Sequence, residues 1–165
     1  ITFDTMMLAC AVHELRQRIV GARVEKITQP GEFATQWSLY GGGRKFTVFC
    51  ETCPESSRFH LTTRGLASPP TPPMFCMLLR KLLSGAYIED ITLPRGIGER
   101  IVKIDFVSDG LPYSYYIELM GRRGNQIVVS ENGFILGSIK RVTTEMSRVR
   151  PILLLYTSDA ADDLT

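Results

Sequence analysis

The stretch TPPMFCMLLRKLLSG, residues 71–85, predicts the helix around which the rest of the chain is organised. Thr71 offers a hydroxyl for an N-cap, and Pro72 and Pro73 suit a first turn that needs no backbone donors. Gly85 is placed to end the helix in a left-handed conformation. Apolar residues at spacings of three and four form a continuous stripe of Phe75, Leu78, Leu79 and Leu82. We therefore expect a helix with one buried face.

A second amphipathic helix is predicted near the start of the chain, from a cap at Asp4 to about Val20, with Gly21 as its stop. The residues of its apolar face are Leu8, Ala11, Val12, Leu15 and Ile19. His13 lies largely off this face, so we interpret it as a boundary residue of the helix and not as a ligand.

Short segments rich in aromatic and β-branched residues predict strands on both sides of the central helix. Those before it are residues 24–27, 36–40, 45–50 and 58–61; those after it are residues 87–93, 100–106, 114–120, 126–129 and 134–142. Turns rich in glycine and proline separate them, which favours antiparallel hairpins. The predicted fold class is α+β, with two antiparallel β blocks and two main helices in one domain.

The composition fits one globular domain. The chain has 165 residues, of which 44% are hydrophobic and 22% charged, and no stretch approaches the roughly 20 apolar residues that span a bilayer. No secretory leader is visible, and four cysteines are too few for a dense disulfide pattern. These features predict a cytoplasmic protein without a membrane partner.

The last residues differ from the rest. From Leu154 onward the sequence LLYTSDAADD resembles the in-frame translation of a sequencing-library adapter, so we expect a domain at residues 1–153, truncated at its C-terminal end, and a non-native tail at 154–165. Without that tail the chain has 19 basic and 14 acidic side chains, a net charge of +5. A moderately basic domain is compatible with a nucleic-acid partner.

Familiar catalytic and cofactor motifs fit poorly. Cys50 and Cys53 form a lone C-x-x-C without further zinc ligands or a thioredoxin-like context. Gly41–Arg44 precedes a predicted strand, which favours a hairpin turn over a phosphate loop. Only His13 and His60 are available for a catalytic triad. We expect no cofactor, no metal and no catalytic residue.

Two polar clusters remain, PRGIGER at residues 94–100 and ELMGRRGN at residues 118–125. Both place charges where the chain enters or leaves a predicted strand. Glycine beside arginine permits close approach to a polyanion, and guanidinium groups can bind phosphate or a base edge. The alternative from spacing alone is that these are solvated turn charges.

Several ordered motifs resemble the N-terminal domain of the NFACT family, which includes bacterial RqcH, formerly called fibronectin-binding protein A, and eukaryotic NEMF. They are PPMFCMLLRKLLSG (72–85), ELMGRRGN (118–125) followed by IVV, and FILGSIKRV (134–142). Shorter matches occur in the same order at residues 3–4, 24–30 and 58–62. The resemblance covers nearly all of residues 1–153.

The resemblance implies a fold similar to the N-terminal domain of formamidopyrimidine-type DNA glycosylases, and a role in ribosome-associated quality control. Members of the family bind large ribosomal subunits obstructed by peptidyl-tRNA. They recruit charged tRNA, alanyl-tRNA in bacteria, for template-free tailing of the stalled chain. It also implies a tRNA-binding factor and not an enzyme, because transfer takes place at the ribosome's own centre.

The resemblance also implies a set of tRNA-binding residues: Glu99, Arg100, Glu118, Leu119, Met120, Arg122 and Arg123. Glu99 stands where the family has Asp, and Arg123-Gly124 where members commonly have His-Ser. Arg100 and Arg122 would contact tRNA phosphates or base edges. Glu99 and Glu118 would orient those arginines or accept from a base. Met120 would pack under the turn.

Two other classes of function stay open as alternatives. The implied fold suggests a DNA glycosylase, but such enzymes use an N-terminal Pro next to Glu, and Ile1-Thr2-Phe3-Asp4 offers neither. The old family name suggests a surface adhesin that binds fibronectin, for which a leader would be expected.

Overall fold

The computed structural model describes residues 5–140. It contains two α-helices, nine strands and one short 3₁₀ helix. In chain order they are α1 (Thr5–Ile19), β1 (Arg23–Gly31), β2 (Ala34–Gly41), β3 (Arg44–Cys53), β4 (Ser56–Thr62), α2 (Met74–Leu83), β5 (Tyr87–Thr92), β6 (Ile101–Ser108), β7 (Leu111–Glu118), η1 (Gly121–Arg123), β8 (Asn125–Ser130) and β9 (Ile135–Ser138). The predicted cap at Asp4, the domain boundary at residue 153 and the tail at 154–165 lie outside the described residues.

Helix α1 confirms the predicted apolar face. Its buried residues are Leu8, Val12, Leu15 and Ile19. The helix stops before Gly21, whose φ of +89° is a conformation that glycine adopts without steric cost. His13 is exposed and lies 3.3 Å from the Gln17 side chain, as expected for a residue off the apolar face.

Helix α2 is buried on one face as predicted, but it begins later than expected. The predicted cap at Thr71 is wrong, because the helix starts at Met74 with Pro73 as its N-cap and no side-chain cap bond. Pro73 has an extended backbone with ψ of 160°, so the two prolines lead into the helix instead of forming its first turn. Gly85 has a φ of +81°, which confirms the predicted left-handed ending.

Strands β1 to β4 form an antiparallel meander after α1. The β2–β3 hairpin is in continuous register from Ala34↔Glu51 to Gly41↔Arg44. Gly42 and Gly43 close it with positive φ values of 60° and 76°, so the glycine run is a hairpin turn as predicted. The predicted strands are each present and longer than expected.

Strands β5 to β9 repeat this pattern after α2. Along β6, the side chains of Val102, Ile104 and Phe106 are buried, whereas Lys103 and Asp105 are half-buried. This is the alternation that the sequence predicted. Ile101 is also buried, in a small second cluster with Tyr116, Ile127 and Val129 on the other face of this half.

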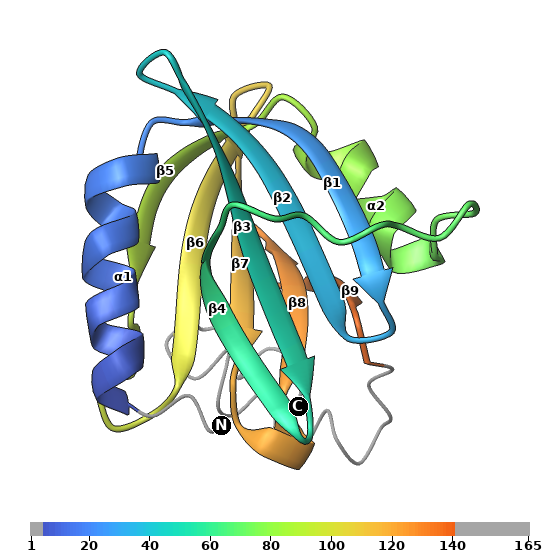
Figure 1. The fold of residues 1–165 in the computed structure, drawn as a ribbon. Coiled ribbons are helices and arrows are strands. Elements are labelled where there is room, and N and C mark those ends of the chain that lie inside the picture. Colours follow the sequence, from blue (N-terminus) through green and yellow to red (C-terminus); the bar gives the residue numbers. More distant parts are fainter. Residues whose placement is uncertain (1–4, 141–165) are drawn as a thin grey trace.

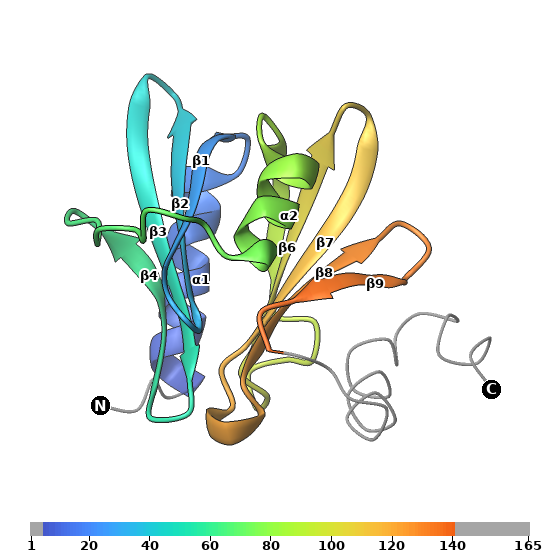
Figure 2. The same cartoon turned by 90° about the vertical axis from the view of Figure 1, so that its right-hand side faces the viewer.

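The strands make one sheet in the order β4-β3-β2-β1-β5-β6-β7-β8-β9. It bends where β1 meets β5, so that the two halves face each other, as Figures 1 and 2 show. Between them Trp37 of β2 stacks on Phe106 of β6, with ring centroids 5.4 Å apart. Helices α1 and α2 flank this core, and each contacts the first strand of the other half, β5 and β1 respectively. The α+β class with two β blocks is thus confirmed.

No disulfide joins the four cysteines, all of which lie within residues 5–140. Cys50, Cys53, Cys76 and Cys10 are all free thiols. Cys50 is fully buried in β3, and burial raises the pKa of its thiol to about 12. Such a thiol stays protonated at neutral pH. Within residues 5–140, no group of three or more His, Cys, Asp or Glu side chains could hold a metal ion.

Neither helix in the described part of the chain is long and apolar enough to cross a membrane.

Candidate nucleic-acid interface

The two polar clusters of the sequence meet where strand β6 begins and strand β7 ends. Ile101, the first residue of β6, pairs with Glu118, the last residue of β7. One residue beyond this pair, the Leu119 amide donates to the Arg100 carbonyl oxygen at 2.8 Å. The Glu99–Arg100 segment and the 118–125 segment therefore lie side by side, and the structure brings the predicted residues into one region.

The loop before β6 presents an ion pair. The Arg95 Nε atom lies 3.3 Å from the Glu99 carboxylate, and Glu99 is the more exposed partner, with 43% of its side chain accessible against 23% for Arg95. Gly96, with φ of +79°, permits the tight turn between them. Glu99 thus contacts Arg95, a partner that the sequence analysis did not single out. Arg100 is half-buried.

The turn between β7 and β8 presents two arginines. It is the 3₁₀ helix η1, in which Arg122 and Arg123 are both exposed. Gly121 has a φ of +57°, which favours glycine at that position. Gly124 is tightly enclosed, because an added Cβ would lie 3.0 to 3.1 Å from the carbonyl oxygens of Glu118, Gly121 and Thr52. The glycines on either side of the arginines are therefore required by geometry.

The segment 118–120, where the pairing of β7 with β6 ends, is largely buried. Glu118 and Leu119 are fully buried, with 0% accessibility each. The expectation that Glu118 accepts from a base is therefore not met in this conformation, because its side chain is enclosed by the sheet. Met120 is half-buried and packs against the second cluster of Ile101 and its neighbours. Its role beneath the turn stays a prediction.

Lys140 and Phe33 belong to the same region, although neither is among the site residues predicted from the sequence. The Lys140 ammonium lies 3.4 Å from the Arg122 carbonyl oxygen, to which it donates, and 5.0 Å from the centre of the Phe33 ring. Burial lowers the pKa of Lys140 below its ordinary value. Lys140 lies in the FILGSIKRV motif, but only the fold shows which surface it joins.

Asn125 holds Lys140 in place. Its side-chain oxygen accepts from the Lys140 amide at 2.9 Å and from the Gln126 amide at 2.9 Å. Its side-chain nitrogen donates to the Lys140 carbonyl oxygen at 3.4 Å. Asn125 is fully buried, so these hydrogen bonds are shielded from water. The backbone of residue 140 is thereby fixed next to η1.

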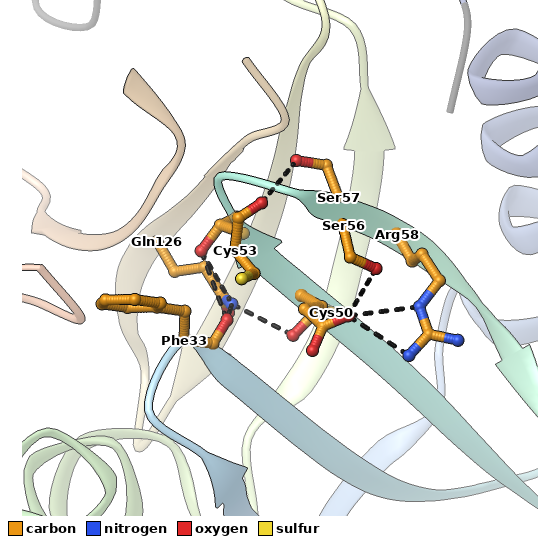
Figure 3. Close-up of polar contacts among 9 residues, drawn as sticks. Phe33, Cys50, Cys53, Ser56, Ser57, Arg58 and Gln126 are labelled. Atoms are coloured by element: carbon orange, nitrogen blue, oxygen red, sulfur yellow. Dashed lines mark hydrogen bonds and ion pairs between the residues drawn. The ribbon is translucent and has the colours of Figure 1, made fainter. Parts of the chain in front are cut away.

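Gln126 ties this region to the first half of the fold, as Figure 3 shows. Its side-chain nitrogen donates to the carbonyl oxygens of Phe33 at 3.2 Å and Cys50 at 3.1 Å. Its side-chain oxygen accepts from the hydroxyls of Thr35 at 2.6 Å and Tyr115 at 2.7 Å. A fully buried amide with partners on both atoms is a strong positional restraint.

The β3–β4 hairpin lies against η1 as a result. Its own geometry is stabilised by Glu51, which accepts from Ser56 at 3.0 Å and from Arg58 at 3.2 Å. Ser57 donates to the Cys53 carbonyl oxygen at 3.4 Å, also drawn in Figure 3. The candidate surface thus rests on both halves of the sheet.

These residues form a basic, glycine-containing surface. Arg100, Arg122, Arg123 and Lys140 contribute cations, and Phe33 contributes an aromatic ring. Guanidinium groups on exposed turns bind phosphate and base edges, and they need no catalytic group to do so. The arrangement suits recognition of a polyanion.

A family model described as the NFACT N-terminal and middle domains matches residues 4–157. Among curated proteins, the chain is 32% identical over 157 residues to the Rqc2 homolog RqcH of Bacillus subtilis (strain 168). It is 30% identical over 159 residues to the Rqc2 homolog RqcH of Streptococcus pneumoniae serotype 2. Each alignment covers 93% of this chain and 28% of the relative, so the chain spans less than a third of their length.

Solved structures agree with this relationship. The N-terminal domain of the fibronectin-binding protein PavA from Streptococcus pneumoniae superposes with a TM-score of 0.82 at 31% identity, covering 86% of this chain and 55% of that one. The fibrinogen-binding protein from Staphylococcus aureus gives a TM-score of 0.78 at 29% identity, covering 88% of this chain and 53% of that one. The family match over most of the chain, the identity to curated relatives and these folds lead to one conclusion: the chain belongs to the NFACT family.

Proposed function

We propose that this domain is the tRNA-binding N-terminal part of a ribosome-associated quality control factor. The whole factor would bind large ribosomal subunits obstructed by peptidyl-tRNA and recruit charged tRNA, alanyl-tRNA, for template-free tailing of stalled chains. Family membership and the likeness to proteins named Rqc2 homolog RqcH support this proposal. It places the protein in the cytoplasm and assigns it no cofactor, metal or catalytic residue.

The observation that carries the proposal is the meeting of two basic turns. The Leu119 to Arg100 backbone hydrogen bond, 2.8 Å long, places the loop before β6 beside η1. Arg100, Arg122 and Arg123 would contact tRNA phosphates or base edges. Glu99 would hold Arg95 in position through their 3.3 Å ion pair. Lys140 would add a further cation on the same surface.

The buried residues of the region would hold the arginines in position. Leu119 and Met120 would pack beneath the turn, and Glu118 lies inside the sheet between Ile101 and Asn125, with which it pairs. They would fix the direction in which Arg100 and Arg122 point. In this scheme Glu118 is a positioning residue and does not contact tRNA.

The test is a titration of the chain with folded tRNA at about 50 and 200 mM salt. Arg122→Ala should weaken binding about 10- to 100-fold and lower the salt slope by about 1, because it removes one charged contact to phosphate. Arg100→Ala should act in the same direction. Arg64→Ala, at an exposed arginine of the connector between β4 and α2, is the matched control and should leave binding unchanged.

Circular dichroism must show that the variants remain folded. If tRNA binds equally well to the parent, Arg100→Ala and Arg122→Ala, the site assignment is refuted. A duplex DNA containing a damaged base belongs in the same assay, because excision of that base would support the alternative of a DNA glycosylase, the class whose fold the family resemblance implies.

A second candidate function is adhesion to fibronectin. It is favoured by the name of one similar structure, the fibronectin-binding protein PavA. Immobilised fibronectin would distinguish the two proposals: saturable binding that Arg122→Ala leaves intact would favour the adhesin, whereas tRNA binding that depends on Arg122 favours the quality control factor.

A further inference from the structure

Four exposed side chains form a row across the outer face of the sheet. Tyr87 of β5 is directly opposite Arg23 of β1, Arg23 is opposite Tyr40 of β2, and Tyr40 is opposite Lys45 of β3. Residues directly opposite each other in antiparallel strands project from the same face. The row therefore alternates aromatic, basic, aromatic and basic side chains. We call it the Tyr–Arg ladder.

The ladder faces solvent. Tyr87 is 54% exposed and Tyr40 is 43% exposed, and both are among the exposed large hydrophobic residues of the described chain. Arg23 and Lys45 are exposed as well. The neighbouring residues Val24 and Leu39 point the other way, with 1% accessibility each, into the core. Successive side chains of a strand point to opposite faces of the sheet, so the ladder faces solvent while the adjacent residues face the core.

The backbone under the ladder is well fixed. Where β1 meets β5, the Gly21 amide donates to the Ile88 carbonyl oxygen at 2.7 Å, and the Val24 amide donates to the Ala86 carbonyl oxygen at 2.8 Å. These bonds lie on either side of the Arg23↔Tyr87 pair. Adjacent strands lie about 4.8 Å apart and the sheet bends between β1 and β5, so the two tyrosine Cα atoms, two strands from each other, are at most about 10 Å apart. The rings are therefore held at a defined spacing.

The surroundings of the ladder are basic on one side. Beyond Lys45, a cleft of about 470 Å³ is lined by the cations Arg18, Arg44 and Lys45 together with threonines and the apolar side chains Phe46 and Leu61. No carboxylate lines it, but Arg18 is paired with Glu14 at 3.6 Å, so Arg44 and Lys45 are its main cations. Glu25 and Glu89, two residues further along β1 and β5, limit the basic surface in that direction. A polyanion would therefore extend from the ladder into the cleft.

Aromatic rings that alternate with cations on a sheet surface suit single-stranded nucleic acid. Each exposed ring can stack one base, and each cation can neutralise a phosphate between two bases. Duplexes hide their base faces and cannot use the rings. The hairpin between β2 and β3 and the turn η1 stand at opposite ends of the sheet in Figure 1, so the ladder is separate from the candidate tRNA surface.

We infer that the Tyr–Arg ladder, with the adjoining cleft, is a second nucleic-acid site that binds a short single-stranded segment of RNA. One base stacks on Tyr40 and one on Tyr87, while Arg23 and Lys45 contact the backbone. The choice of RNA over DNA rests on the proposed function. The stacking site itself does not, because it follows from the register of four strands.

The test uses the 165-residue chain and a fluorescent single-stranded RNA of about ten uridines, followed by anisotropy. Tyr40→Ser and Tyr87→Ser should each weaken binding about 5- to 100-fold, because each removes a stacking surface. Tyr40→Phe and Tyr87→Phe should bind like the parent, since the ring is retained. Phe134→Ser is the matched control, because it removes an aromatic ring of similar exposure, 51%, from the residue directly before β9.

The cations are tested by salt dependence. Arg23→Gln and Lys45→Gln should each reduce the slope of log affinity against log salt by about 0.7, the value for one phosphate contact on a single strand. Lys81→Gln, an exposed lysine on α2, should leave the slope unchanged.

The ladder is refuted if Tyr→Phe weakens binding as much as Tyr→Ser, if Phe134→Ser does the same, or if a duplex RNA competes as well as the single strand. Tighter binding of a single-stranded DNA of equal length would overturn the choice of RNA. The outcome is independent of Arg122: uridine binding that depends on the tyrosines supports the ladder even if the tRNA titration fails.

Discussion

The side-chain amide of Gln126 on β8 donates to the carbonyl oxygen of Cys50 on β3 across 3.1 Å, and this bond joins the two halves of the fold. The same amide accepts from the Tyr115 hydroxyl at 2.7 Å and from Thr35 at 2.6 Å. Thr35 in turn accepts from the Trp37 indole at 2.9 Å. One side chain thus organises a buried polar network at the end of the sheet where the basic turns lie.

Gln126→Leu is expected to lower the free energy of unfolding by about 3 kcal/mol. It removes the Gln126 partner from the hydroxyls of Tyr115 and Thr35 and from two carbonyl oxygens, and a buried polar group left without a partner costs about 1–3 kcal/mol. Urea unfolding measures the effect. Gln36→Leu is the control, because Gln36 is half-buried on the outer face and bonds only to the backbone of Leu66. An equal loss in both variants would contradict the assigned role of Gln126.

Gly124→Ala is expected to destabilise the turn η1 and weaken tRNA binding. The added Cβ would lie 3.0 to 3.1 Å from three backbone carbonyl oxygens, so the turn has to shift, at a cost of about 1–3 kcal/mol. Thermal unfolding and the tRNA titration should both report it. Gly98→Ala, with no atom within 4 Å of its added Cβ, should be neutral in both assays. Unchanged unfolding of Gly124→Ala would mean that η1 is not confined as described.

Leu79→Ala is expected to cost about 2–5 kcal/mol of stability, because Leu79 is fully buried at the centre of α2. Met77→Ala, two residues away and 55% exposed, should change stability by less than about 0.5 kcal/mol. Chemical denaturation of both variants compares the two faces of the helix. Similar costs would show that α2 is not packed on the face that its sequence predicts.

Alkaline pH is expected to lower the stability of the protein, because a buried thiol and a buried tyrosine hydroxyl would have to lose their protons. The Cys50 thiol has its pKa raised by burial from 9.0 to about 12, so the folded state holds its proton more tightly than the unfolded chain. Burial also raises the pKa of Tyr115. The resulting stability is fully present below pH 9 and is lost as pH rises from 9 towards 12. Urea unfolding at several pH values measures this slope.

Cys50→Ala should make that slope shallower than in the parent. The comparison uses slopes and not absolute stabilities, because Cys50→Ala also removes buried atoms. A parent whose stability is constant between pH 8 and 11 would disprove the linkage.

Local patterns predicted the elements well. The stripe of α1, the left-handed ending at Gly85 and the Gly42-Gly43 hairpin each depend on residues that are neighbours in sequence, so spacing and glycine chemistry are sufficient. The start of α2 was misplaced because a Thr followed by two prolines satisfies the rules for a helix start and also those for an extended connector. The extended ψ of 160° at Pro73 settles which applies.

The site was only partly visible in the sequence. The clusters 94–100 and 118–125 were recognisable from their charges and glycines, and the fold brings them together. Lys140 and Phe33 join them only through long-range contacts, which local patterns do not encode. The burial of Glu118 was likewise hidden, because a glutamate at the end of a predicted strand is usually exposed. The Tyr–Arg ladder depends on the register of four strands, which no single stretch contains.

Because each helix packs against the other half of the sheet, each half of the chain needs the other half in order to fold. Helix α1 contacts β5, and α2 contacts β1, so each half presents its core to a helix from the other. The exposed connector at residues 63–70 is the natural place to divide the chain. Separately expressed pieces ending and beginning there should each stay largely unfolded and regain structure on mixing, which would make this domain a split pair suited to fragment complementation.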